Sequence, residues 1–529
     1  MVTNSSYNRF RSTPTSIPPQ MIRPPRFAHF TAFHATVLNG CEPPAAPMLV
    51  RLPYYRWLVV GTVCIGAFMG QVDSSIAQLL LPRLEYDFGA RLSTVSWVAV
   101  AYLITMAAFL PIFGRIADIV GRKLLYTGGF LLFVLGSGLC GLASNLPMLI
   151  SFRVIQAIGA ALLASNSVAI VVTVAGPEQR GRALGIQAAA QAGGLSLGPM
   201  IGGLVLATLN WRWVFWINVP FGLAASVIGW FVIPPTADIS GKGRFDWKGA
   251  LLILPALAAF IALINEAHVW GVTSPLFLGG GLVTVVFMFL FLCQERGNAE
   301  PLINFSLFRI NAFWAGNVAA LMSYANLFGL FFLMPFVFIR IYHDNVLIAG
   351  VRLAIVPATL GLIAPISGTL SDRIGTRILT ISGMVFCSIG LLLLYFTIDG
   401  NVDSLPTVMA ALAIFGFGMG LFASPNNNAI MAAAPPHMTG TAGGLMNVIR
   451  SLGMSIGISA SAALMSSRLS TLTGRIVNTI DVSPDILLHA GRGVILLLID
   501  FAAVGGLLSF AGVHAQQLPA STATSSKTA

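Results

Sequence analysis

The stretch Gly114-Arg-Ile-Ala-Asp118-Ile-Val-Gly121-Arg122-Lys123 separates two apolar segments and returns later in the chain. The second copy reads Gly368-Thr-Leu-Ser-Asp372-Arg373-Ile-Gly375-Thr-Arg377, so both follow the frame G-x-[LI]-[AS]-D-x-x-G-x-[KR]. A generic basic turn explains one such stretch, but not two in the same frame. Duplicated helical bundles often carry their binding site between the two halves. The repeat therefore predicts a molecule built from two related halves.

The composition around these loops is that of a membrane protein. Of 529 residues, 56% are apolar and only 9% are charged, whereas soluble globular proteins have about 25% charged residues. A large soluble enzyme is excluded, and so is global disorder, which requires low hydrophobicity and high charge. The five cysteines lie far apart and form no disulfide framework or zinc spacing.

The apolar segments are long enough to cross a bilayer, whose core takes roughly 20 residues of helix. We predict an all-α integral membrane protein with 14 transmembrane helices and both termini on one side. The predicted spans are 57–81, 94–113, 124–143, 147–173, 183–207, 213–233, 249–267, 274–293, 313–340, 349–370, 378–397, 406–431, 440–466 and 492–513.

The basic residues predict the orientation of these spans. Loops after even-numbered spans contain twelve Lys and Arg residues, and loops after odd-numbered spans contain seven. Because short cytoplasmic loops carry the excess of Lys and Arg, we expect the twelve-residue set and both termini in the cytoplasm. Most of the net charge of +11 then sets the orientation of the helices in the membrane. A nucleic-acid partner is not needed to explain it, and none is expected.

The two ends of the chain show no spanning segment. Residues 1–55 are rich in proline and lack the pattern of a signal peptide. We expect a disordered cytoplasmic tail or an over-long gene start with Met48 as the initiator, and a regulatory segment is the third alternative. Residues 516–529 are rich in Ser, Thr and Ala and read as a second disordered tail.

The fifth predicted span contains a dense small-residue pattern, G-x8-G-x3-G-P-x2-G-G. Its fixed positions are Gly185, Gly194, Gly198, Pro199, Gly202 and Gly203. Small residues on one helix face allow a neighbouring helix to approach closely. Ordinary packing in a membrane bundle is the alternative interpretation.

These motifs resemble those of the major facilitator superfamily, and within it the fourteen-span drug/proton antiporters of the EmrB/QacA type. The resemblance covers about residues 55–515 and implies two six-helix bundles, 56–235 and 313–515, plus two extra central helices within 236–312. It implies that the repeated loops help to set the conformational state, and that the span 5 pattern marks exporters. The first loop departs from the family at Ile119, where an arginine usually follows the aspartate.

Charged residues at membrane depth are few. A charge at the centre of a spanning helix costs about 2.5–3.5 kcal/mol on insertion scales, so each needs a partner, water or a function. Asp73 lies among polar neighbours in span 1, and a carboxylate in a low-dielectric site takes up a proton more readily than in water. A lipophilic cation bound nearby would expel that proton. The alternatives are a structural ion pair or a helix cap.

Four arginine and acid positions complete this set. The resemblance assigns Arg153 of span 4 a role in proton movement, and snorkelling towards the outer interface is the alternative. Arg352 and Arg450 lie near span ends and read as structural, and Asp500 has no assigned partner. Weaker candidates for a substrate cavity are polar or amphipathic residues at membrane depth, which helix–helix hydrogen bonding would explain equally well: Gln78, Tyr102, Gln156, Asn166, Tyr324 and Asn326.

The resulting functional hypothesis is a proton-coupled exporter of small amphipathic compounds in the plasma membrane. The chain has no G-x-x-x-x-G-K-[ST] pattern for ATP, and we expect no cofactor, no metal and no enzymatic activity. A monomer is expected, and a periplasmic adaptor partner is left open. The alternatives are an importer or facilitator of a small nutrient and, more remotely, a membrane-embedded sensor or enzyme.

Overall fold

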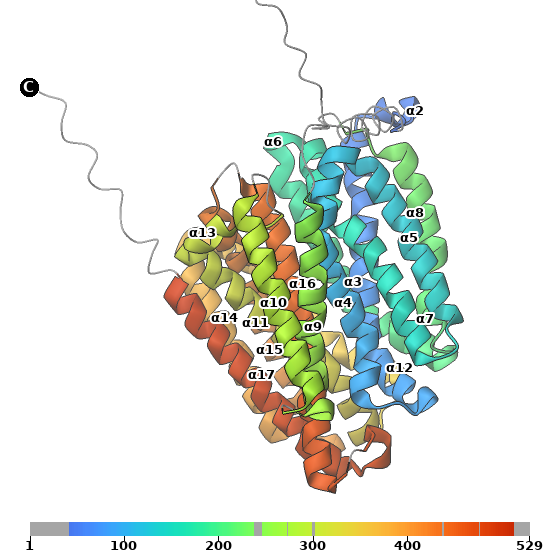
Figure 1. The fold of residues 1–529 in the computed structure, drawn as a ribbon, viewed down its shortest axis with the longest axis vertical. Coiled ribbons are helices and arrows are strands. Elements are labelled where there is room, and N and C mark those ends of the chain that lie inside the picture. The colour runs from blue at the N-terminus through green and yellow to red at the C-terminus, as the bar shows by residue number, and fades with distance from the viewer. Residues whose placement is uncertain are drawn as a thin grey trace, which may run out of the picture.

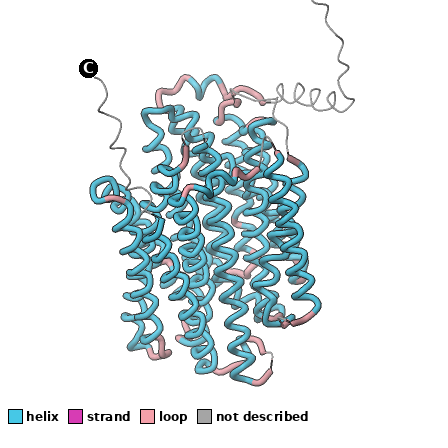
Figure 2. Tube along the Cα trace, turned by 60° about the vertical axis from the view of Figure 1, so that its left-hand side comes forward, coloured by secondary structure: helices cyan, strands magenta, loops and turns pink. Residues whose placement is uncertain are grey.

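A computed structural model describes residues 42–236, 246–271, 273–298, 302–435, 438–475 and 477–512. These residues form helices that run roughly parallel to one another, with no strand in the described ranges (Figure 2). In the first part of the chain the helices are α2 (Pro47–Val50), α3 (Tyr55–Phe88), α4 (Leu92–Val120), α5 (Arg122–Leu142), α6 (Leu146–Thr208), α7 (Trp213–Trp216), α8 (Asn218–Val232), α9 (Trp247–Trp270) and α10 (Pro275–Gly297).

The second part repeats this organisation with more short helical turns. Its elements are η1 (Phe305–Arg309), α11 (Asn311–Phe336), the π-helical turn η2 (Val337–Ile341), α12 (Val346–Leu353), α13 (Ile355–Ile374), α14 (Thr376–Thr397), η3 (Val402–Ser404), α15 (Leu405–Ala433), α16 (Thr439–Thr473), η5 (Thr479–Asp481) and α17 (Pro484–Gly512). Fourteen helical segments of the described chain are long and apolar enough to cross a membrane. Each of the fourteen predicted spans overlaps one of them, so the predicted count is confirmed.

Two span boundaries differ from a simple reading of the helix bounds or of the sequence. α6 contains both the fourth and the fifth span, which meet at Gly176, where the backbone has φ 73° and ψ 172°. The last span begins at Pro484, eight positions earlier than the predicted residue 492, because the segment before it is already helical. The long loop predicted between the last two spans is therefore shorter than expected.

The repeated loops are turns of a single residue. α4 continues to Val120 and α5 starts at Arg122, so the chain reverses at Gly121, which has φ 113°. The second copy reverses at Gly375, with φ 83°. Both φ values are in the region that favours glycine, which explains the second glycine of the frame. The first glycines, Gly114 and Gly368, lie inside helices.

We call the end of the molecule with Gly121 and Gly375 the loop-motif end, and the opposite end, with Gly89 and Gly400, the far end. The N-terminal bundle is α3 to α8, and the C-terminal bundle is α11 to α17 (Figure 1). The bundles meet through α4 against α16, through α6 against α12 and α13, and through α3 against α11. α9 packs on α4 and α16, across the seam, while α10 packs on α9 and has only 6% of its spanning window buried.

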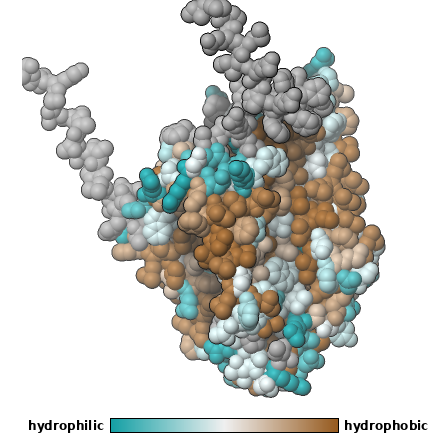
Figure 3. All heavy atoms as spheres, in the orientation of Figure 1, coloured by the Kyte–Doolittle hydropathy of each residue, from teal (hydrophilic) through white to brown (hydrophobic). Residues whose placement is uncertain are grey.

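The outer surface suits a lipid environment. Large apolar side chains are exposed along the bundle faces, including Phe221 at 62%, Leu251 at 72% and Leu362 at 71%. Apolar residues form a broad region across the middle of the face in Figure 3, and hydrophilic residues gather towards its ends. A contiguous apolar surface of this extent is stable in a bilayer and not in water.

Part of the predicted disordered tail is ordered. Residues 42–54 pack on the N-terminal bundle at the loop-motif end, so the tail prediction is wrong for this stretch, and residues 1–41 lie outside the described residues. The Glu42 carboxylate accepts hydrogen bonds from the backbone N–H of Leu124 (3.1 Å) and of Thr236 (2.8 Å). Lys123 Nζ donates to the Pro43 carbonyl oxygen at 2.7 Å. Glu42 thus joins the start of α5 to the chain after α8.

Replacing Glu42 by Ala should lower stability, because hydrogen bonds to a charged acceptor contribute roughly 1.5–3 kcal/mol. We expect a lower midpoint of thermal unfolding for purified Glu42→Ala protein in detergent, followed by fluorescence. Glu42→Gln keeps one acceptor oxygen, so its unfolding midpoint should lie between those of the unaltered protein and Glu42→Ala. Equal midpoints for all three proteins would show that this contact does not hold the segment.

Candidate functional site

The centre of the N-terminal bundle contains a buried ion pair between Asp73 of α3 and Arg153 of α6. Arg153 Nη1 lies 2.6 Å from Asp73 Oδ2, and each side chain is only 1% exposed. Arg153 and Gln156 are three residues apart on α6 and therefore share one helix face. Gln156 donates from Nε2 to Asp73 Oδ1 at 2.8 Å, and its Oε1 accepts from Arg153 Nη1 at 2.7 Å. Three side chains thus form a closed set of contacts.

Further polar groups complete the surroundings of this pair. Asn218, at the start of α8, donates from Nδ2 to Asp73 Oδ1 at 3.2 Å. Ser137 of α5 accepts from Gln156 at 3.1 Å and from Asn218 at 3.2 Å. Arg153 also donates from Nε to the Val98 carbonyl oxygen at 3.0 Å. We call Asp73, Arg153, Gln156, Asn218 and Ser137 the Asp73 cluster.

An aromatic ring covers the arginine of the cluster. The guanidinium carbon of Arg153 lies 4.1 Å from the centroid of the Tyr102 ring of α4, a cation–π contact. The Tyr102 hydroxyl and Arg153 Nη2 are buried and have no hydrogen-bond partner among the described residues. Arg153 and Tyr102 therefore each retain one polar group without a hydrogen-bond partner in the described chain.

This geometry excludes one alternative for each charge. Arg153 points inward to Asp73 and is fully buried, so snorkelling towards the interface is wrong. Asp73 is in an ion pair rather than a helix cap. Removing one partner of a buried ion pair leaves the other charge uncompensated, at a typical cost of about 3–5 kcal/mol. A proton on Asp73 would have that effect on Arg153, so the pair is chemically suited to couple protonation to rearrangement.

The glycines of the span 5 pattern divide between two neighbours. A Cβ at Gly194 would collide with the backbone of α3 at Phe68, and a Cβ at Gly202 would crowd Ile76. Gly198 packs equally closely on α3. Gly203 instead packs on the backbone of α12 in the other bundle, near Leu347. Close approach, expected for the whole pattern, is therefore found at four of its glycines, and Gly185 has no other heavy atom within 4 Å of a Cβ position.

The far end of the interface between the bundles is closed. The carbonyl oxygen of Pro199, the proline of the span 5 pattern, lies directly against Gly350 of α12. Glu85, near the end of α3, accepts a hydrogen bond from the backbone N–H of Thr479 in the C-terminal bundle at 2.6 Å, and Glu85 is fully buried. Arg340 donates to the carbonyl oxygen of Ile480 at 2.9 Å, which fixes the loop that contacts Glu85.

A second ion pair lies close to this closure. Arg352 of α12 is 2.6 Å from Asp344, which gives Arg352 the structural role expected from the sequence. Burial raises the pKa of the Asp344 carboxyl, and the Arg352 guanidinium opposes that rise. Asp500 is exposed on α17, and no ion pair joins it to another described residue.

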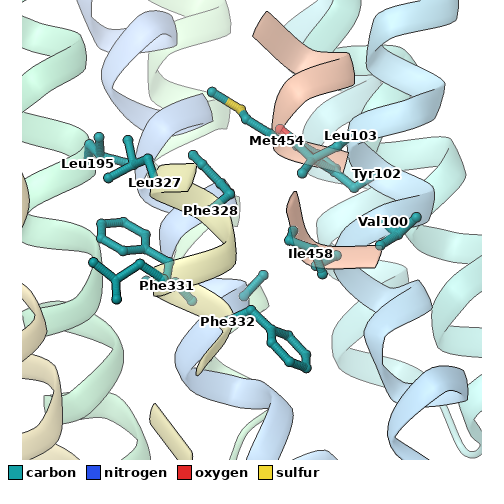
Figure 4. Packing of buried hydrophobic residues seen from close by; sticks show 14 of the residues in the cluster. Val100, Tyr102, Leu103, Leu195, Leu327, Phe328, Phe331, Phe332, Met454 and Ile458 are labelled. Carbon is teal, nitrogen blue, oxygen red and sulfur yellow. The ribbon is translucent and has the colours of Figure 1, made fainter. Parts of the chain in front are cut away.

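The middle of the interface is a packed apolar layer. Figure 4 shows Met454 of α16 beside Leu103 of α4, and Leu195 of α6 near Leu327 of α11. All four side chains are buried. Nearer the loop-motif end of the same helices, Gly185 of α6 and Gly443 and Gly444 of α16 have no heavy atom within 4 Å of a Cβ position.

Arg450 of α16 lies one helical turn before Met454 of the packed layer. Its Nη1 is 3.5 Å from Oε1 of Gln191 on α6, so the contact crosses between the bundles. Its guanidinium carbon lies 4.9 Å from the centroid of the Tyr324 ring of α11. Arg450 was expected to be structural and near a span end, but it lies at the interface between the two halves.

The six predicted cavity residues have different surroundings. Gln156 and Tyr102 belong to the neighbourhood of Asp73, and Tyr324 contacts Arg450. Asn166 donates to the Leu162 carbonyl oxygen of its own helix at 2.8 Å, so this hydrogen bond lies within α6 and does not join two helices. The last two predicted residues are Gln78 and Asn326, which are fully buried and whose amide atoms have no hydrogen-bond partner in the described chain.

Several residues of the site were not singled out from the sequence. Asn218 ends the stretch Trp211-Arg-Trp-Val-Phe-Trp-Ile-Asn218, which resembles a family motif, so a signal for it existed. Ser137 lies in an apolar run without any distinguishing pattern. Gln191 and Glu85 gave no signal either, because their partners lie in the other half of the chain.

The first loop motif makes its described polar contacts within the N-terminal bundle. Asp118 accepts from Arg122 Nη2 at 3.0 Å, and the backbone N–H of Arg122 donates to Thr236 Oγ1 at 2.8 Å. The roles expected for Asp118, Gly121, Asp372 and Arg373 in setting the conformational state stay predictions. Within the described ranges, no group of three His, Cys, Asp or Glu side chains could hold a metal ion.

Two helical bundles around a central interface, one with a buried ion pair, define a multi-pass membrane protein with the architecture of a secondary transporter. The chain matches the model of the Major Facilitator Superfamily over residues 63–458. It belongs to the major facilitator superfamily, and the family and the relatives below are transporters.

Named relatives cover most of the chain. The riboflavin transporter RibZ of Clostridioides difficile (strain 630) is 34% identical over 405 residues, 76% of this chain and 86% of that protein. A multidrug resistance protein B homolog of Mycobacterium tuberculosis (strain ATCC 25618 / H37Rv) is 31% identical over 413 residues, 77% of this chain and 75% of that protein. Among solved structures, a bacterial homolog of the human lysosomal transporter Spinster, in an inward-facing and unoccupied conformation, has a TM-score of 0.63. It is 16% identical and covers 88% of this chain and 99% of its own, which supports the fold alone.

The glycines of span 5 provide a matched test of packing. Gly198→Ala places a Cβ against Ser75 and 3.1 Å from the Val72 carbonyl oxygen of α3, whereas Gly185→Ala meets nothing within 4 Å. We expect Gly198→Ala to reduce the yield of monodisperse protein in size-exclusion chromatography. Gly185→Ala should be neutral or more stable by up to about 1 kcal/mol, because alanine favours a helix. Equal behaviour of the two variants would contradict the assigned packing.

Proposed function

We propose that this protein exports small amphipathic compounds across the plasma membrane in exchange for protons, by alternating access between its two bundles. The observation that carries the proposal is the buried Asp73–Arg153 ion pair. An ionisable pair inside a transmembrane bundle is a typical component of a proton relay. In a chain without an ATP-binding pattern, an ion gradient is the remaining source of energy.

The pair supports a specific coupling step. Protonation of Asp73 removes the negative charge that compensates Arg153, and the buried arginine then needs water or another acceptor. The typical cost of such an uncompensated charge, about 3–5 kcal/mol, changes a two-state equilibrium on the order of a hundred- to several thousand-fold. The direct side-chain contacts join Asp73 of α3 to residues of α6 and α8, so their release would loosen the N-terminal bundle itself.

The span 5 pattern supports closure at the far end and, by family resemblance, export. Gly203 and Pro199 bring α6 against α12, and Glu85 holds the loop at Thr479. With the loop-motif end in the cytoplasm, as the distribution of Lys and Arg predicts, the described state would be closed to the outside. We propose the same orientation for both termini, and a monomer as the working unit.

Import of a small nutrient is the second candidate, because one relative is named a riboflavin transporter. Direction of flux separates the two. In vesicles of known orientation with an imposed pH gradient, export predicts substrate movement opposite to the protons. Movement of substrate and protons in the same direction would support import.

Asp73→Asn tests the coupling role. We expect the variant, reconstituted in proteoliposomes, to lose transport driven by a pH gradient and to retain exchange of labelled for unlabelled substrate across a membrane without a gradient. The amide cannot gain or lose the proton, while its shape and hydrogen bonds to Gln156 are largely kept. Initial rates of both processes give the readout.

The matched control is Asp73→Glu, which keeps an ionisable group and should retain part of the gradient-driven rate. If Asp73→Asn shows unchanged gradient-driven transport, the Asp73 assignment is wrong. If driven transport and exchange fall by the same factor in both variants, the pair is structural only.

A further inference from the structure

Arg450 is incompletely satisfied. Its Nε is buried without a hydrogen-bond partner in the described chain. Its one hydrogen bond to a described residue, from Nη1 to Gln191 Oε1, is long at 3.5 Å. No carboxylate of the described residues lies within 4.0 Å of its guanidinium. Charged residues in spanning helices usually pair or face a wet cavity, and they mark substrate pathways.

Other arginines inside the spanning helices have better acceptors. Arg153 pairs with Asp73 and Arg352 pairs with Asp344, each at 2.6 Å. Arg492 donates to the Ile398 carbonyl oxygen at 2.9 Å. Arg450 therefore differs from each of these in lacking a strong acceptor, although its side chain is partly exposed.

The surroundings of Arg450 place it at a position that both bundles share. Gln191 belongs to the N-terminal bundle, and Arg450 and Tyr324 belong to the C-terminal bundle. On the far side of Arg450, one turn along α16, Met454 lies in the buried apolar layer (Figure 4). On the other side, Gly443 and Gly444 face open space. Arg450 thus lies between the buried apolar layer and a stretch of α16 whose glycines have no close neighbours.

Arg450 is a positive charge without a negative partner among the described residues at the interface between the bundles. Asp73 and Arg153 compensate each other within the N-terminal bundle, so Arg450 leaves one positive charge at the interface. A lipophilic cation bound there would be repelled. A carboxylate, sulfonate or phosphate would instead accept charge-assisted hydrogen bonds from the guanidinium edge, since the Tyr324 ring covers one face.

We propose that Arg450 is the group that binds the acidic head of the transported compound, and that the substrates are amphipathic organic anions with an apolar body. Gln191 supplies an amide to the same head group, and Tyr324 holds the guanidinium in place. The proposal rests on the transport function proposed above and specifies its substrate class. Because the head group would contact both α16 and α6, its binding connects the two bundles directly.

The proposal is tested by binding, without any proton gradient. Three probes share one ring system and differ in charge: naphthalene-2-acetate, naphthalene-2-acetamide and 2-(2-naphthyl)ethylammonium. Purified protein in detergent is titrated with each probe, and its thermal unfolding midpoint is followed. We expect the carboxylate to raise the midpoint most, and Arg450→Gln to weaken its apparent affinity at least about tenfold, as expected for loss of a charged hydrogen bond. The amide should be little affected.

Two further variants separate binding from folding. Gln191→Glu places a carboxylate beside the guanidinium and should neutralise it in place, so the protein stays folded while carboxylate binding falls. Arg450→Lys keeps the charge and should retain most of the binding. Binding of the carboxylate probe is measured without a proton gradient, and the transport assay of Asp73→Asn is measured with one, so failure of proton coupling and failure of this proposal remain distinguishable.

The outcomes that overturn the proposal are equal stabilisation by the three probes, preference for the ammonium probe, or no stabilisation by any of them. Unchanged carboxylate binding in Gln191→Glu would also overturn it. If Arg450→Gln does not yield folded protein, carboxylate binding by Gln191→Glu and Arg450→Lys decides whether Arg450 binds the acidic head.

Discussion

The buried ion pair between Asp73 and Arg153 is the interaction on which the N-terminal bundle depends. Two charges that would each be costly in a membrane interior are brought to 2.6 Å, and Gln156 and Asn218 supply the remaining hydrogen bonds to the carboxylate. Asp73 is in α3 and Arg153 is in α6, so the ion pair fixes the orientation of these two helices relative to each other and also neutralises both charges. A polar cluster of this kind is stable only when it is complete. Removing or adding one proton therefore affects the whole bundle.

The two ends of the interface between the bundles are unequal. Backbone approaches through Gly203 and Gly350, and the contact between Glu85 and Thr479, close the far end. Towards the loop-motif end the helices carry glycines without close neighbours. Arg450 lies where these regions meet, and this is the level at which a bound compound would touch both halves. The proposed proton site and the proposed substrate site are thus separate groups, and α6 contributes a residue to each of them, Arg153 and Gln191.

The sequence predicted the fold well and the site in part, for physical reasons. Bilayer thickness and hydrophobicity give fourteen spans, and the repeated loop identifies two halves, because both signals are local in the chain. Asp73 and Arg153 could be singled out because each is a costly charge within an apolar run. Their direct contact could not be derived, since residues 73 and 153 meet only through helix packing. Gln191 and Ser137 were not singled out for the same reason. The contact of Arg450 with Gln191 could not be predicted either, because it joins two different bundles.

The central claim is that Asp73 changes its protonation state during transport. Infrared difference spectroscopy on the reconstituted protein measures this directly, because a protonated carboxyl group has a C=O stretching band that a carboxylate lacks. The account predicts that this band appears as the pH is lowered, and that it is missing in Asp73→Asn. A band of unchanged intensity in the variant, or no titrating carboxyl band in the unaltered protein, would contradict it.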